Sequence, residues 1–373
     1  MTEFNPASIL IRAPNWVGDV VMCTPALRSL RKRFPRARIS VIIKPSLRRV
    51  LENFPHIDEI IEWDHKGRHK GLKNYIAFVR GLRQRRFAMG VAMTSSFSSA
   101  QLLFLAGIPV RAGYSRNGRG FLLTHTKKPL REKGKIVPVN KVEMDLGLCE
   151  LLGCSDLSTK TELGLSIEAQ AWVEKFFVDR GITSADFAVC IIPGATFGSS
   201  KCWKEDYFAR LCDGLIEQFG AKILVLPGPG ELAIARSIID HMKEKPIDMG
   251  DTIVPLDVLI ALISSCGLLI TNDTGPRHFG VARDKPVVVI MGSTDSRHTD
   301  CNLDKTIILQ EKVDCGPCHL RVCPSDHRCM TLITPEKVLA AASEMIEKYN
   351  VIAASVTTQV ARVQGSGASG GSV

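Results

Sequence analysis

Short runs of apolar, mostly β-branched residues alternate with segments of helical period along nearly the whole chain. The apolar runs predict strands at 8–13, 38–43, 59–63, 89–94, 187–192, 222–227, 268–272 and 286–291. The helical periods predict helices at 25–34, 46–53, 72–86, 168–180, 205–219, 231–243, 256–265 and 335–348. Thr24 is the expected N-cap of the first helix, with Pro25 at its first position. Nearly all-apolar strands separated by helices are typical of βαβ units, so the pattern predicts an α/β protein.

A polar, turn-rich stretch without period, residues 155–167, divides this pattern into two halves. We therefore expect two Rossmann-like domains, over 1–160 and 166–350, whose parallel sheets face a central cleft. The glycine- and serine-rich residues 355–373 are expected to form a flexible tail. Ligands of such sheets bind at the carboxyl ends of the strands, so the motifs that follow strands are the functional candidates.

Charge is distributed unevenly between the two halves. The chain of 373 residues has a net charge of +10, but residues 1–165 hold 28 Lys and Arg against 13 Asp and Glu. This basic half predicts an anionic partner: nucleic acid, an anionic membrane or a phosphorylated glycan. Nucleic acid is disfavoured, because aromatic residues make up only 6% of the chain and no binding module is recognisable. No apolar run approaches the roughly 20 residues of a membrane span, and the N-terminus lacks a secretory signal, so we expect a cytoplasmic protein.

The first predicted strand runs into the sequence Pro-Asn-Trp-Val-Gly-Asp at residues 14–19. Gly18 would allow a ligand to approach the backbone closely. Asp19 would place a carboxylate at the rim of the cleft, either as a helix cap or as a general base. The segment lacks the GxGxxG fingerprint, which disfavours a nicotinamide-dependent dehydrogenase.

Two motifs of the second half follow strands in the same way. In PGATFGSSKCW (193–203), Thr196 and the glycine-rich backbone offer donors and Lys201 offers a positive charge, which suits a phosphate held without a metal or else a solvated turn. Glu231 follows a Pro/Gly turn at the start of a predicted helix. Its carboxylate would interact with the helix dipole or accept hydrogen bonds from a ribose or sugar.

The sequence NDTGPRH (272–278) combines turn formers and ionisable groups directly after a predicted strand. Thr274 and Gly275 would expose donors at a helix N-terminus, where a diphosphate is favoured, and Arg277 would add a charge. His278 is either a structural histidine or a catalyst.

Four cysteines lie close together in the sequence CGPCHLRVCPSDHRCM, with His319 and His327 between them. Cys315, Cys318, Cys323 and Cys329 are candidate ligands of a structural zinc ion, while loop packing or a disulfide would also explain the cluster. The other cysteines are expected to be buried thiols.

Four of these segments together resemble the ADP-heptose:lipopolysaccharide heptosyltransferases, from about Ile9 to Ile346: APNWVGDVVMCTPALRSL, PGATFGSSKCW, NDTGPRH and CGPCHLRVCP. The resemblance implies a GT-B fold, in which the first domain binds the acceptor and the second the nucleotide sugar. It also implies inversion at the anomeric carbon without a cofactor or a catalytic metal. The sequence departs from the family pattern at Lys204, where proline is expected, and at Arg277, where methionine is common.

The resemblance also assigns roles to residues. Asp19 falls on the family's general base. Donor-binding residues are expected at Thr196, Lys201, Glu231, Asp273, Thr274, Gly275, Pro276 and His278. Acceptor-binding residues are expected at Asn15, Trp16, Arg116 and Arg119. A candidate patch for the anionic acceptor is formed by Arg111, Arg116, Arg119, Lys127 and Lys128, although such a run of basic residues is also typical of a solvated surface.

The implied reaction moves L-glycero-D-manno-heptose from ADP-heptose onto heptosyl-Kdo2-lipid A in lipopolysaccharide core biosynthesis. A transferase of the same family acting on Kdo2-lipid A or at a later heptose is the alternative. The lipid-linked acceptor would place the protein peripherally on the inner face of the inner membrane.

Overall fold

The computed structural model describes residues 4–352, which form two compact units. The first unit comprises residues up to Gly164 together with Arg297–Asn302, and the second comprises Leu165–Ser296 and the residues from Leu303 onward. Each unit is described by itself below. The tail expected at 355–373 lies outside the described residues.

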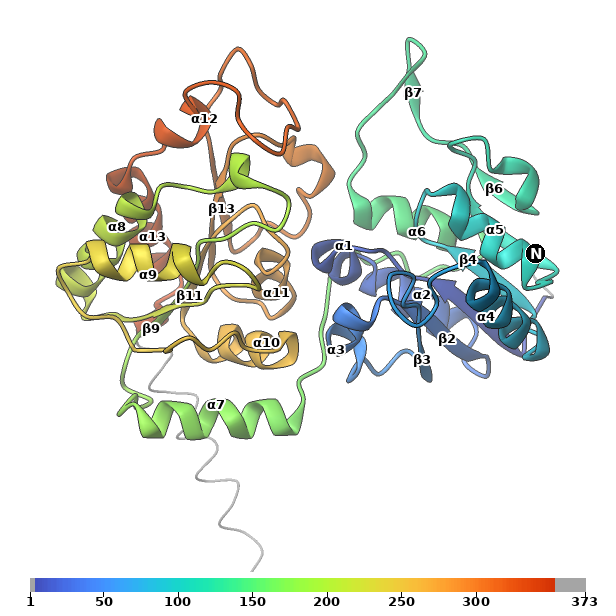
Figure 1. Ribbon diagram of the computed structural model, residues 1–373, viewed down its shortest axis with the longest axis horizontal. Helices are drawn as coiled ribbons and strands as arrows, with labels where there is room; N and C mark the ends of the chain where they lie inside the picture. The colour runs from blue at the N-terminus through green and yellow to red at the C-terminus, as the bar shows by residue number, and fades with distance from the viewer. Residues whose placement is uncertain (1–3, 353–373) are drawn as a thin grey trace, which may run out of the picture. The chain divides into compact units, whose positions relative to one another are not determined.

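The first unit is built on a six-stranded sheet in the order β3-β2-β1-β4-β5-β6, and every pairing in it is parallel (Figure 1). This is the strand order of a Rossmann fold. Its strands are β1 Ser8–Arg12, β2 Arg38–Ile43, β3 Glu59–Glu62, β4 Met89–Ala92, β5 Val110–Tyr114 and β6 His125–Lys127, followed by a hairpin of β7 Arg131–Glu132 and β8 Lys135–Ile136. Its helices are α1 Val17–Met22, α2 Thr24–Arg33, α3 Arg48–Leu51, α4 Leu72–Gln84, α5 Phe97–Leu105 and α6 Lys141–Leu151.

The second unit holds a five-stranded parallel sheet in the order β10-β9-β11-β12-β13. Its strands are β9 Ala188–Ile192, β10 Lys222–Val225, β11 Leu268–Asn272, β12 Val287–Met291 and β13 Thr306–Gln310. Its helices are α7 Ile167–Asp179, α8 Glu205–Phe219, α9 Leu232–His241, α10 Leu256–Ser265, α11 Arg277–Ala282, α12 Arg328–Thr331 and α13 Pro335–Lys348. Strands β9, β11 and β12 are buried along their whole length, as their apolar sequences predict.

The predicted α/β class is confirmed, and each predicted strand is present within about two residues of its expected bounds. One helix start is corrected: Thr24 is the first residue of α2 rather than its N-cap, and its hydroxyl donates to the Val21 carbonyl oxygen at 2.8 Å. The sequence interpretation missed helices α5, α6 and α12 and strands β5, β6, β7, β8 and β13. No helix within residues 4–352 combines the length and the apolar character that a bilayer span requires.

Candidate functional site

The loop that carries Asp19 leaves the carboxyl end of β1, the central strand of the first sheet. Helix α1 begins at Val17, and its N-cap is Trp16, which makes no side-chain capping bond. Asp19 lies in the first turn of α1 and is partly exposed, while Gly18 is buried. Asp19 is therefore not the N-cap residue of α1 but lies in its first turn, at the strand end where ligands of such sheets bind.

Two cations that the sequence interpretation did not single out hold this loop in place. Arg12 at the end of β1 is buried, and its Nη2 donates to Asn15 Oδ1 at 2.8 Å. Lys44 Nζ donates to the Asn15 carbonyl oxygen at 3.2 Å and lies 5.9 Å from the Trp16 ring centroid. The indole of Trp16 remains 50% exposed. Asn15 is therefore a fixed part of the loop, the indole of Trp16 presents an apolar face to solvent, and acceptor binding by the two residues stays a prediction.

A buried ion pair on α6 lies in the electrostatic neighbourhood of Asp19. Lys141 Nζ contacts both carboxylate oxygens of Asp145, which is only 2% exposed. Burial raises the pKa of Asp145 to about 6, the Lys141 charge opposes this rise, and the charge of Asp19 adds to it. Lys141 and Asp145 are four positions apart, the spacing of an ion pair on a helix, but the sequence analysis did not predict α6 and therefore missed the pair.

The two arginines expected to bind the acceptor differ in their surroundings. Arg119 is completely buried, and its guanidinium donates to the carbonyl oxygens of Tyr114 and Ser96 and to Ser99 Oγ, at 2.7–3.0 Å. The structure thus contradicts acceptor binding by Arg119, whose side chain braces the loops around it. Arg116 is partly exposed, and its Nε has no hydrogen-bond partner within residues 4–352. Acceptor binding by Arg116 stays a prediction.

In the second unit, the carboxylate of Asp273 joins the loops that follow β9 and β11. Lys201 Nζ donates to Asp273 Oδ2 at 2.6 Å and to its carbonyl oxygen at 3.0 Å. Arg277 Nη1 donates to Oδ1 at 2.7 Å, and Thr294 Oγ1 donates to Oδ2 at 2.7 Å. Burial disfavours the charge of Asp273, but the charges of Arg277 and Lys201 outweigh it and hold the pKa of this carboxyl well below its usual range. The three ionised groups carry a net charge of one positive unit.

This cluster corrects the expectation for Arg277 in the NDTGPRH motif and bears on the two alternatives for His278. Arg277 is 1% exposed and forms an ion pair with Asp273, so its guanidinium is not a solvent-exposed charge available to a phosphate. His278 is buried as well, and burial together with the Arg277 charge lowers its pKa to about 3, so the imidazole is neutral near pH 7. Helix α11 has only six residues and begins at Arg277, directly after its N-cap Pro276. Within residues 4–352, Lys201 Nζ donates two hydrogen bonds, both to Asp273, and an ammonium group has three N–H donors.

Glu231 lies between the glycine loops that follow β9 and β10. Its Oε2 accepts a hydrogen bond from the Gly228 N–H at 2.7 Å, and a Cβ atom at Gly194 would lie only 1.9 Å from its carboxyl group. Burial raises the pKa of Glu231. The position predicted for this residue, at the start of α9 after a Pro/Gly turn, is confirmed. Thr196 is exposed at the tip of the first of these loops, and Thr274 and Gly275 are partly exposed after β11.

The four clustered cysteines line one small cavity of about 60 Å³ in the second unit. All four thiols are free, and no three His, Cys, Asp or Glu side chains among the described residues are grouped as a metal site. The structural zinc ion therefore stays a prediction.

The cysteine loop is fastened to the Lys201 loop. The Ser200 N–H donates to the Arg321 carbonyl oxygen at 3.1 Å, His327 Nε2 donates to the Ser200 carbonyl oxygen at 2.8 Å, and Arg321 Nε donates to the Phe197 carbonyl oxygen at 2.9 Å. A Cβ atom at Gly198 would lie 2.2 Å from the Arg321 carbonyl oxygen. The two segments therefore pack at backbone distance.

Each unit thus presents its polar loops at the carboxyl edge of a parallel sheet. The first offers a carboxylate and an exposed indole, and the second offers a lysine, a buried carboxylate and glycine-rich backbone. Two Rossmann-like units with polar loops at the carboxyl ends of their strands are the architecture of the GT-B class of enzymes.

Comparison with known proteins specifies the family. The pattern of glycosyltransferase family 9 (heptosyltransferase) matches residues 75–328. The chain belongs to this family, which confirms the resemblance drawn from the motifs. Lipopolysaccharide heptosyltransferase 2 of Salmonella typhimurium is 24% identical over 355 residues, covering 92% of this chain and 99% of that protein.

Two solved structures share the fold. The ADP-heptose lps heptosyltransferase II of E. coli superposes with a TM-score of 0.73 at 23% identity, covering 92% of this chain and 99% of that one. The glycosyl transferase family 9 protein of Veillonella parvula superposes with a TM-score of 0.82 at 24% identity, covering 93% and 99%. The GT-B fold class is thereby confirmed.

Proposed function

We propose that the protein transfers L-glycero-D-manno-heptose from ADP-heptose to heptosyl-Kdo2-lipid A, with inversion at the anomeric carbon. The Lys201–Asp273 pair is the observation that carries this proposal, because it fixes a cation with a third N–H donor at the edge of the second sheet. The names of relatives in the same family, lipopolysaccharide heptosyltransferase 2 among them, support the choice of donor and acceptor.

The chemistry needs one base and one charged site for the leaving group. Asp19 would take the proton of the acceptor hydroxyl as that oxygen forms its bond to the anomeric carbon. The bond from this carbon to the ADP oxygen breaks in the same step, and the negative charge that develops on the diphosphate would be stabilised by Lys201. Glu231 would accept hydrogen bonds from hydroxyl groups of the donor. No metal ion and no cofactor take part in this scheme.

ADP release from ADP-L-glycero-β-D-manno-heptose tests the proposal, with heptosyl-Kdo2-lipid A or Kdo2-lipid A as the acceptor. We expect release that depends on the first acceptor, and a product whose new linkage has the α configuration by NMR. Asp19→Asn should lower kcat at least about 100-fold while the donor still binds, since general-base catalysis typically contributes that much. Asp179→Asn on α7, which removes an exposed carboxylate paired with Lys175, is the matched control and should leave kcat unchanged.

Each alternative result has a defined meaning. Release with Kdo2-lipid A alone would assign the protein to the first heptose of the core. A β-configured product would exclude inversion. Equal activity of Asp19→Asn and wild type would exclude Asp19 as the base.

A further inference from the structure

A long stretch of the first unit contains no acidic residue. Residues 65–131 hold 14 Lys and Arg and not one Asp or Glu. Within it, Arg80 and Arg83 lie on α4 and Arg86 follows the helix. All three are exposed, and none forms an ion pair or a side-chain hydrogen bond within residues 4–352. Arg85 between them differs, because it pairs with Glu59 at 2.7 Å.

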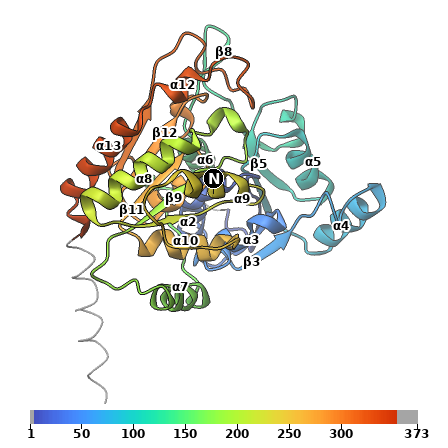
Figure 2. The same ribbon diagram turned by 60° about the vertical axis from the view of Figure 1, so that its left-hand side comes forward.

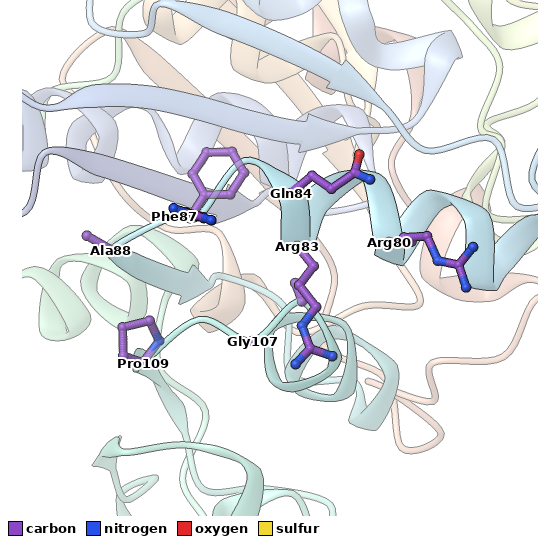
Figure 3. Close-up of a pocket in the computed structure, with 9 residues that line it drawn as sticks. Arg80, Arg83, Gln84, Phe87, Ala88, Gly107 and Pro109 are labelled. Atoms are coloured by element: carbon purple, nitrogen blue, oxygen red, sulfur yellow. The ribbon is translucent and has the colours of Figure 1, made fainter.

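These three arginines line one surface pocket of about 550 Å³ at the amino ends of β4 and β5 (Figure 3). Arg83 extends from α4 toward the Gly107 turn, where a Cβ atom would lie 3.5 Å from its Nε. No carboxylate lines the pocket. Three guanidinium groups without a counter-charge favour a phosphate group, which arginine binds through paired N–H donors.

The same helix exposes aliphatic side chains. Leu72 and Ile76, one turn apart on α4, are 74% and 49% exposed. At the end of α5, which contacts α4, Phe104 and Leu105 are 47% and 39% exposed. No other element of the first unit covers the outer side of α4 in Figure 2. Exposed apolar side chains beside arginines supply the two attractions that bind a protein to an anionic bilayer surface, namely apolar insertion and attraction to lipid phosphates.

The inner side of α4 is well packed, so the exposed residues are not needed to hold the helix. Val79 and Leu82 are buried in a cluster with β1, β2 and α5. The Phe78 ring lies 4.5 Å from the ring of Trp63, and the Tyr75 ring lies 5.6 Å from it. Substitution of the outer residues should therefore leave the fold intact.

We infer that the outer face of α4, formed by Leu72, Ile76, Arg80, Arg83 and Arg86 and here named the α4 basic face, binds the surface of a bilayer that contains anionic phospholipids. The arginines would contact lipid phosphates, and the aliphatic side chains would enter the boundary between headgroups and acyl chains. A single-stranded nucleic acid would instead stack its bases on exposed aromatic rings, and none of the five residues of this face is aromatic.

The inference extends the proposed function, because a lipid-linked acceptor would have to be met at a membrane. Helix α4 follows β3 and therefore begins at the carboxyl edge of the first sheet, the edge from which the Asp19 loop also leaves. A bilayer along α4 would thus extend from this edge, at Leu72, to the opposite edge of the sheet, where Arg80, Arg83 and Arg86 lie beside the amino ends of β4 and β5. Vesicle binding tests the inference without any catalytic turnover. Membrane binding can therefore fail while the proposed reaction is confirmed, and the reaction can fail while membrane binding is confirmed.

The test is co-sedimentation of the full-length protein with vesicles of phosphatidylcholine, with and without phosphatidylglycerol. We expect binding only to the anionic vesicles, weakened by salt. The triple variant Arg80→Gln/Arg83→Gln/Arg86→Gln should bind about 100-fold more weakly, since each basic residue near an anionic surface contributes roughly fivefold. The matched control Arg180→Gln/Lys243→Gln/Lys245→Gln removes the same charge from exposed sites of the second unit and should bind within about threefold of wild type.

A second variant separates a lipid surface from a simple anion site. Leu72→Gln/Ile76→Gln keeps every arginine and should still lose at least about tenfold in vesicle binding, because two aliphatic side chains no longer enter the interface. Equal losses in the two triple variants would overturn the inference, since binding would then follow net charge alone. Binding of inorganic phosphate without any vesicle binding, or equal binding to vesicles lacking phosphatidylglycerol, would also overturn it.

Discussion

Replacing Asp273 by asparagine would remove one negative charge from between two cations that are nearly out of solvent. The side chains of Lys201 and Arg277 are 13% and 1% exposed, and their nitrogens lie 2.6 and 2.7 Å from the Asp273 oxygens. Two unit charges about 4 Å apart interact by about 4 kcal/mol at an effective dielectric constant of 20. Breaking a buried pair by removing one partner costs about 3–5 kcal/mol, because the other charge stays buried without compensation. We therefore expect Asp273→Asn to lower the free energy of unfolding by about 3–5 kcal/mol.

Thermal and urea unfolding of the full-length protein would measure this loss. For a unit of this size, 1 kcal/mol corresponds to about 2–4 °C, so Tm should fall by roughly 6–20 °C. Asp284→Asn is the matched control: it removes a carboxylate that is 74% exposed and pairs with Lys305 at 2.7 Å. Exposed ion pairs contribute at most about 1 kcal/mol, so this variant should unfold close to wild type. If both variants lost the same stability, burial would not be what makes the Asp273 pairs important, and the reasoning would be refuted.

Three further predictions concern other parts of the candidate site. Gly194→Ala places a Cβ against the Glu231 carboxyl group, which must then move. Because a hydrogen bond to the donor would be lost, KM for ADP-heptose should rise about tenfold, with Tm little changed. An unchanged KM in initial-rate kinetics would exclude Glu231 from the donor site. The pKa of Asp145 is raised to about 6 in the folded state, so its contribution to stability is present below about pH 4 and is lost as the pH rises through 6. The free energy of unfolding of Asp145→Asn should therefore rise relative to that of wild type by up to roughly 3 kcal/mol between pH 4 and pH 7. Urea unfolding that gives the same difference between variant and wild type at both pH values would contradict this. Protein purified under reducing conditions should hold about one zinc ion per chain by elemental analysis, and Cys329→Ser should lose it; a metal-free wild type whose cysteines all react with a thiol reagent would exclude the zinc site.

Strand positions were predictable because buried parallel strands have nearly continuous apolar sequences, as in Val287–Met291. The missed elements lack such a signal. Strand β5 contains Arg111 and Gly113 and is only partly buried, and α5 is apolar on most of its circumference, so it shows little helical contrast. These segments form through contacts with neighbouring strands rather than through a local pattern.

The site was predictable as a set of loops but not as a set of contacts. The motifs placed Lys201 and Asp273 at the same sheet edge, each as a separate donor-binding residue. Their ion pair joins residues 72 positions apart, and no spacing rule along the chain indicates it. Arg119 illustrates the opposite error: its basic neighbours suggested an exposed patch, whereas its bonds to Ser96 and Ser99 depend on a loop about 20 residues earlier.

The backbone contact between Gly198 and Arg321 has a consequence for engineering this enzyme. Any side chain at position 198 would collide with the Arg321 carbonyl oxygen, and the Ser200 N–H donates to that same oxygen. A chimera that takes only one of the two loops from a relative would pack it against a loop of different sequence, and the close backbone contact would be strained or lost. The segments 197–201 and 313–329 should therefore be grafted together, as one cassette, whenever donor preference is exchanged between members of the family.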